Sequence, residues 1–408
     1  MTAPAPARFR SLDIFRGATV ALMILVNNPG SWAHLYPPLA HAPWHGCTAT
    51  DLVFPFFLFA VGNALALVMP GLQGAVFWPR VLRRTALIFA IGLCLNAAPF
   101  VRWNADGELV LRSWDTLRTM GVLQRIALAF GAAAVVVRLV ASTRGVLAVA
   151  AVLLLGYWAA CLAFGAPGDA YSPAGWFGTA LDRTLLGAAH LYQGEGRPFD
   201  PEGLASTAPA IAQVLLGWWV GAKVLAAGRV APSTAPRHLV SKLAWQLACM
   251  GLALVGAGLL WQQLGLPFNK KIWTSSYVLF STGWATLMLA ALIALVEGRG
   301  VAPWLAGWAR AFEVFGRNPL FIFVLSGLVP RVLALWRWPV GVDVGPSAGV
   351  STDGSPVWMT PLPWLYQHVF AGIASDPRTG SLLYAAALLA GYAALAWWLD
   401  HRRIYIRV

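Results

Sequence analysis

Apolar runs of roughly 20 residues recur along the whole chain and alternate with short polar segments. A helix of about 20 apolar residues is long enough to cross a bilayer core. The pattern therefore predicts an all-α, polytopic integral membrane helical bundle, with residues 1–408 as one transmembrane domain. A Trp-rich segment at 301–312 is predicted to lie at the membrane interface, where Trp is enriched. We expect ten spanning helices, over residues 12–33, 51–70, 85–100, 117–137, 145–165, 207–227, 243–264, 275–296, 314–336 and 379–399.

The composition agrees with a membrane protein and argues against two other classes. Hydrophobic residues make up 59% of the chain and charged residues 11%, whereas soluble domains carry about 25% charged residues. The net charge of +13 does not indicate nucleic-acid binding, because the basic residues are dispersed and form no block of like charge. The four cysteines are scattered, so no disulfide framework is expected.

The distribution of basic residues predicts the topology. Of the 29 basic residues, 18 fall in segments on the side of the two termini and 11 on the opposite side. The positive-inside rule then places both termini in the cytoplasm, with residues 1–10 as a short tail and no cleavable signal peptide. The segments 101–115, 166–206 and 337–378, and the loop around His41, are expected to face outward.

Candidate chemistry concentrates in residues 27–63, where a loop with His34, His41 and His45 leads through Asp51 into the second apolar run. Ionisable groups at a membrane edge favour a functional role. His41 and His45 have a metal-like spacing, but Pro43 opposes a continuous helix between them and no carboxylate pair completes a site, so no metal is predicted. Structural roles stay open, since Asp51 is also placed to close a capping box with Thr48.

Several motifs resemble one known family. They are RFRSLDIFRGATVALMILVNNPG, HAPWHGCTATDLVFPFFLFAVG, MGVLQRIAL (120–128), FDPEGLASTAPAI (199–211), LPFNKKIWTSSYVLFSTG (266–283) and FGRNPLFIF (315–323). In this order they are similar to the heparan-α-glucosaminide N-acetyltransferase family of membrane acetyltransferases. The chain resembles bacterial members that lack the large lumenal amino-terminal domain. The resemblance implies transfer of acetyl from acetyl-coenzyme A to the amino group of a glucosamine-type sugar.

The resemblance also implies site residues, with the catalytic histidine on His41, the loop asparagine on Asn27 and the DLVFP aspartate on Asp51. Imidazole suits a general base near neutral pH. An amide such as Asn27 suits an oxyanion or sugar contact, although Asn27 is equally expected at a helix C-terminus. Asp51 could orient the imidazole. Both direct transfer, which we favour slightly, and a covalent acetyl-histidine relay fit these residues.

Donor and acceptor contacts are predicted from charge. Coenzyme A carries phosphates that need cations, and the resemblance points to Gln124, Arg125, Lys270 and Lys271. Arg125 lies inside an apolar run and must face the bundle interior, where bonding to a neighbouring helix is the alternative. For the sugar we expect contacts from the following residues: Trp44, His45, Asp200 and Glu202.

Two other functions remain open at this point. One is an amino-sugar transporter of the N-acetylglucosamine type, and the other is O-acetylation of an envelope glycan. In each case the partners are a sugar and the lipid bilayer of a bacterial inner membrane, and a homodimer is a further expectation. Transfer of acetyl by purified protein separates the enzyme from the transporter.

Overall fold

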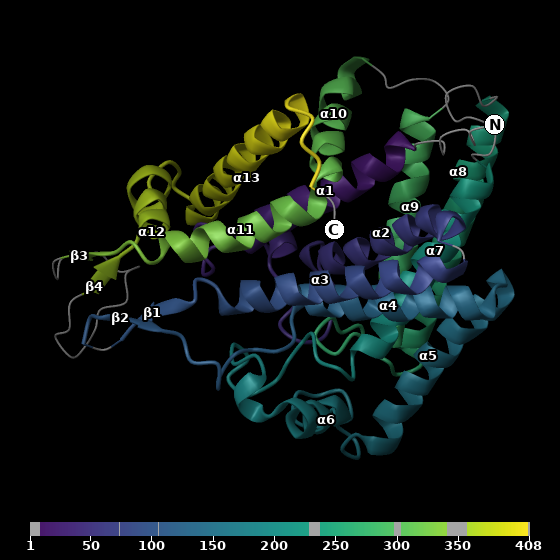
Figure 1. Ribbon diagram of the computed structural model, residues 1–408, viewed down its shortest axis with the longest axis horizontal. Coiled ribbons are helices and arrows are strands. Elements are labelled where there is room, and N and C mark those ends of the chain that lie inside the picture. The colour runs from purple at the N-terminus through teal and green to yellow at the C-terminus, as the bar shows by residue number, and fades with distance from the viewer. Residues whose placement is uncertain are drawn as a thin grey trace.

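The fold is described from a computed structural model, which places residues 9–72, 74–104, 106–227, 237–297, 303–340 and 357–406. Within these ranges the chain is a helical bundle with two small hairpins (Figure 1). The helices are α1 Arg10–Asn27, α2 Val53–Val68, α3 Phe77–Ala97, α4 Val122–Val140, α5 Thr143–Phe164, α6 Phe177–Leu186, α7 Thr207–Ala227, α8 Arg237–Gln263, α9 Ser275–Val296, α10 Pro303–Arg317, α11 Pro319–Leu333, α12 Pro361–Leu365 and α13 Pro377–His401. The predicted all-α polytopic bundle is confirmed.

Seven helices in the described ranges are long and apolar enough to cross a membrane, and the bent pair α10–α11 makes an eighth span if counted as one. Helices α1 and α3 have suitable lengths of 18 and 21 residues. Each carries three charged side chains near one end, however, which lowers its apolar character. The predicted number of ten is reached only when these two helices are counted as spans.

Helices α2 and α7 form the centre of the bundle and pack at close range. A Cβ atom at Gly62 would lie 2.2 Å from the carbonyl oxygen of Val214, and one at Gly217 would lie 2.5 Å from that of Phe59. Small residues allow helices to approach closely in membranes. The core next to this contact includes the fully buried Leu58 and Leu215. The start of α2 follows the short 3-10 turn Thr50–Leu52, which contains Asp51.

Two helix ends differ from the prediction. The first span was expected to reach residue 33, but α1 ends at Asn27, because Asn28 leaves helical geometry and Pro29 follows. The span expected at 314–336 is divided at Asn318 into α10 and α11, which are bent by 81°. Most of the Trp-rich segment predicted to be interfacial belongs to α10; its first two residues lie outside the described ranges.

The segments between helices carry small structured elements. Strands β1 Val101–Trp103 and β2 Leu109–Leu111 pair antiparallel, as do β3 Trp338–Val340 and β4 Val357–Met359. Figure 1 shows both hairpins at the same end of the bundle, near α12. Arg337 lies between the rings of Trp103 and Trp358, with its guanidinium carbon 4.1 and 4.0 Å from their centroids, and joins the two hairpins.

Candidate active site

The His41 loop connects α1 to α2 and is anchored against residues 266–274. The backbone N–H of Gly46 donates to the carbonyl of Phe268 at 2.8 Å. Gly46 has φ of +115°, a conformation that glycine adopts readily. This contact brings two segments that are far apart in the sequence to one end of the bundle.

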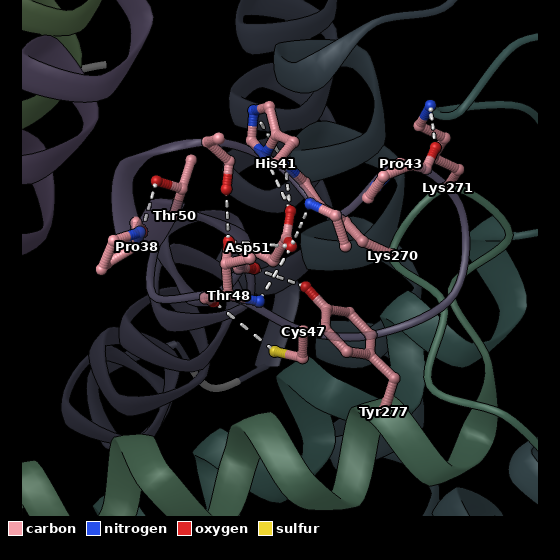
Figure 2. Close-up of polar contacts among 12 residues, drawn as sticks. Pro38, His41, Pro43, Cys47, Thr48, Thr50, Asp51, Lys270, Lys271 and Tyr277 are labelled. Atoms are coloured by element: carbon pink, nitrogen blue, oxygen red, sulfur yellow. Dashed lines mark hydrogen bonds and ion pairs between the residues drawn. The ribbon is translucent and has the colours of Figure 1, made fainter. Parts of the chain in front are cut away.

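His41 and Asp51 form a direct pair (Figure 2). The Nδ1 atom of His41 lies 2.7 Å from Oδ1 of Asp51. The Asp51 side chain is 2% exposed and that of His41 is 37% exposed. Because an ionised carboxylate can only accept, Nδ1 carries the proton in this pair and Nε2 of neutral His41 is left as an acceptor. When His41 is neutral, the pair therefore leaves Nε2 as an acceptor in the cavity lining.

The second carboxylate oxygen of Asp51 fixes the loop. Oδ2 accepts from the backbone N–H groups of Ala42 and Thr48, both at 3.0 Å, and from the Thr48 hydroxyl at 3.1 Å. The Tyr277 hydroxyl donates to the Asp51 carbonyl at 2.5 Å. The capping contact with Thr48 and the orientation of His41 therefore coexist, since each uses a different oxygen of the carboxylate.

A cavity of about 680 Å³ opens beside this pair. Of the residues predicted to form the site, the following line it: Asn27, His41, Trp44, Asp51, Gln124, Glu202, Lys270 and Lys271. The Asn27 side chain makes no hydrogen bond to the described part of the chain, whereas Asn28 caps α1 through a bond to the Ile24 carbonyl at 2.9 Å. Asn27 is thus available to a ligand, and its neighbour takes the helix-ending role.

Three predicted site residues do not line the cavity. His45 lies 3.3 Å from Asn269, with Nδ1 facing the amide nitrogen, and burial lowers the pKa of its imidazole. Arg125 is fully buried and donates to the hydroxyl of Ser206. Asp200 is 1% exposed and is held in an ion pair. Arg125 and Asp200 thus support the wall of the cavity from behind, whereas His45 is an exposed side chain of the loop.

Arg118 organises that wall and was not singled out from the sequence. Its guanidinium contacts Asp200 at 2.6 and 2.9 Å and Glu202 at 2.5 Å, and stacks over the ring of Tyr192 at 4.7 Å. Burial alone would lower the pKa of Arg118, but hydrogen bonds and charge from the two carboxylates raise it above its ordinary value. Arg118 is therefore a permanent cation in the cavity lining.

The two lysines of the NKKIW segment take different positions. Lys270 Nζ lies 3.2 Å from Nδ1 and 3.5 Å from Nε2 of His41, and 3.7 Å from Oδ1 of Asp51. Lys271 turns away to Glu195 at 2.7 Å and to the Pro43 carbonyl at 3.0 Å. Burial lowers the pKa of Lys270, and the negative charge of Asp51 opposes this effect.

Another cation in the lining, Arg331 on α11, was also missed. It donates to the Gly327 carbonyl at 2.6 Å and has no acidic partner in the described ranges. Nothing in the local sequence distinguishes Arg331 from the basic residues that set topology. Arg118 and the two lysines are paired with carboxylates, so Arg331 is the cation of the described lining that is left for a phosphate group.

Comparison with known proteins places the chain in a family. The family described as heparan-α-glucosaminide N-acetyltransferase, catalytic, matches residues 8–252. The human heparan-α-glucosaminide N-acetyltransferase is 29% identical over 375 residues, a match that covers 78% of this chain and 52% of the human protein. The mouse enzyme is 27% identical over 372 residues, covering 78% of this chain and 53% of its own length. The chain spans about half the length of these curated relatives. Since the family match extends over more than half of the chain, the protein belongs to the heparan-α-glucosaminide N-acetyltransferase family.

Proposed function

We propose that this protein is a membrane acetyltransferase that moves acetyl from acetyl-coenzyme A to the amino group of a glucosamine-type sugar. The observation that carries the proposal is the His41–Asp51 pair at the edge of the large cavity. A sugar-binding protein needs the cavity but has no need of an oriented base. The family membership supports the same reaction, because the relatives are named for it.

The cavity lining fits coenzyme A as the donor. Gln124 has a buried amide nitrogen, Nε2, that is unpartnered among the described residues, and it is suited to an amide carbonyl of the pantetheine arm. Arg331, which has no acidic partner in the described ranges, supplies positive charge for a phosphate. Arg125 acts indirectly, since it supports the Gly203–Ser206 turn of the wall. A volume of about 680 Å³ lies within the usual range of about 300–1,000 Å³ for ligand sites.

The acceptor side of the site uses a different set of groups. Trp44 is held by a bond from its indole N–H to the Tyr171 carbonyl at 2.7 Å, so its ring is fixed beside the cavity. Glu202 and Glu195 offer carboxylates to a sugar's hydroxyl or ammonium groups. Asp200 contributes by holding Arg118, and His45 makes an edge contact with the Trp44 ring at a centroid distance of 6.3 Å.

In the proposed reaction the sugar amine attacks the thioester carbonyl while His41 accepts the amine proton at Nε2. Asp51 keeps the required tautomer by accepting from Nδ1. Asn27 donates to the sugar or to the developing oxyanion. We place the reaction at the inner membrane, with both termini in the cytoplasm and the His41 loop outside.

The test is transfer of labelled acetyl from acetyl-coenzyme A by the purified protein in liposomes. Glucosamine is the acceptor, and glucose and N-acetylglucosamine are matched controls that lack a free amine. We expect label only on glucosamine, in a product that resists hydroxylamine, because amides resist it and esters do not. Hydroxylamine-sensitive label on the control sugars would indicate O-acetylation. Sugar uptake into the liposomes without any transfer would indicate a transporter.

A further inference from the structure

Lys270 occupies a position that a residue binding only phosphate would not take. Figure 2 shows its amino group turned toward His41 and Asp51. The Nζ atom lies 3.5 Å from Nε2 of His41, the nitrogen that faces the substrate in the proposed reaction. The Lys270 side chain is 23% exposed, so it reaches the cavity from a largely buried position.

The neighbouring Lys271 shows the contrast within one segment. Its Nζ atom donates to Pro43 and pairs with Glu195, and it lies 5.7 Å from the ring centroid of Trp44. Both lysines line the same cavity. Only Lys270, however, lies within 4 Å of the His41–Asp51 pair.

The chemistry of the donor separates two parts of the cavity. In coenzyme A the thioester and the phosphates lie at opposite ends of the long pantetheine arm. When the thioester reaches His41, the phosphates are therefore remote from it. A cation in contact with His41 is therefore beside the reacting carbonyl rather than beside the phosphates.

We propose that Lys270 is a catalytic residue whose ammonium group donates to the thioester carbonyl oxygen as that oxygen becomes negative. This inference rests on the proposed acetyl transfer. A preorganised donor beside a developing oxyanion stabilises the transition state much more than the ground state. The base at His41 and the charge on Lys270 would then act on the two ends of one reacting centre, the amine and the carbonyl oxygen.

The step balances without a further reactant. The amine lone pair forms the new N–C bond, and the carbonyl π electrons move to oxygen, where Lys270 donates. His41 Nε2 takes the amine proton. The oxygen lone pair then re-forms the carbonyl, the C–S bond breaks, and the leaving thiolate takes the proton from His41. The products are the acetamido sugar and free coenzyme A.

Burial lowers the pKa of the Lys270 ammonium group, and its acidic neighbours oppose this effect. The charges that act on it are those of Asp51 and Glu202, with the Cys47 thiol as a further titratable neighbour. Burial raises the pKa of Cys47 to about 12, so the thiol stays protonated and inert as a nucleophile at neutral pH. The Asp51 carboxylate is thus the main counter-charge at contact distance.

The experiment compares Lys270→Met with Lys242→Met in the purified full chain. Saturating kcat is measured with glucosamine, and acetyl-coenzyme A affinity is measured by calorimetry. We expect Lys270→Met to lower kcat about 10²–10³-fold, the usual cost of losing one oxyanion donor, with affinity changed less than about threefold. Lys242→Met, which changes an exposed lysine of α8 outside the cavity lining, should keep kcat near the parent value. Lys270→Gln gives a second, polar variant, and Lys270→Arg should recover part of the rate.

The outcomes are distinct. A loss of affinity of about tenfold or more in Lys270→Met, or a kcat within about threefold of the parent in both neutral variants, would overturn the role of Lys270. If the parent itself transfers no acetyl, the proposed function fails and this inference fails with it. If the parent transfers acetyl and the Lys270 variants match it, only the inference fails.

Discussion

Asp51→Asn tests how the buried carboxylate controls His41. The amide keeps the shape of the side chain but offers one acceptor oxygen and one donor nitrogen. The backbone N–H groups of Ala42 and Thr48 now donate to Oδ2 of Asp51, each at 3.0 Å. If the amide nitrogen of the new side chain replaced this oxygen, two partly buried donors would lose their acceptor. Each such loss costs about 1–3 kcal/mol, so this orientation is disfavoured by about 2–6 kcal/mol.

The nitrogen is therefore expected to face His41 and to donate to Nδ1. His41 must then carry its proton on Nε2, where it cannot accept one from the amine. We expect kcat for acetyl transfer to fall about 10²–10⁴-fold, with unfolding free energy changed by only about 1–2 kcal/mol. Steady-state transfer at saturating substrates and thermal unfolding monitored by tryptophan fluorescence measure the two quantities.

Asp182→Asn is the matched control, because Asp182 also accepts from two backbone N–H groups, those of Leu204 and Ala205, but lies outside the cavity lining. It should keep parental kcat. If Asp51→Asn folds and keeps a kcat within about tenfold of the parent, the tautomer argument is refuted.

Three further predictions follow from the same structure. Burial raises the pKa of Asp182 to about 6, so the native state binds the proton of this carboxyl more tightly than the unfolded state does. The free energy of unfolding should therefore decrease by up to about 3 kcal/mol as pH rises from about 4 to 6. Thermal unfolding curves measure this decrease, and Asp182→Asn should abolish it. Because burial lowers the pKa of Lys270, the rate of acetyl transfer should fall at an alkaline pH below that at which an exposed lysine titrates. Lys270→Arg should move this fall in rate to higher pH. If the fall stays at the same pH in Lys270→Arg, another group causes it. In a variant without the native cysteines, Leu109→Cys should react with an impermeant maleimide in intact cells. Thr143→Cys should react only after the cells are permeabilised. The reverse pattern would invert the predicted topology.

The sequence was sufficient for the architecture wherever apolar runs have clear ends. The predicted spans 207–227 and 275–296 coincide with α7 and α9. Ends determined by tertiary contacts were less predictable. The bend at Asn318 is one example, because its side chain binds the backbone of Ile404 and Ile406, which are distant in sequence.

The candidate site was predicted in part, and the limits have a physical cause. His41 and Asp51 are ten residues apart in a short loop, so their proximity was predictable from local structure. The contact between His41 and Lys270 joins positions 229 residues apart, and nothing in the local pattern encodes it. Gln124 and Arg125 were predicted together, but successive residues of a helix point about 100° apart, so one lines the cavity and the other supports its wall.

The most direct test of the account is the rate of labelled acetyl transfer to glucosamine by His41→Ala, with His45→Ala as the matched control from the same loop. Loss of the general base should lower the rate about 10²–10⁴-fold in His41→Ala, while acetyl-coenzyme A still binds with parental affinity. His45, which faces Asn269 outside the cavity lining, should tolerate the change with a near-parental rate. Near-normal transfer by His41→Ala, together with loss of transfer in His45→Ala, would contradict the assignment of His41 as the base.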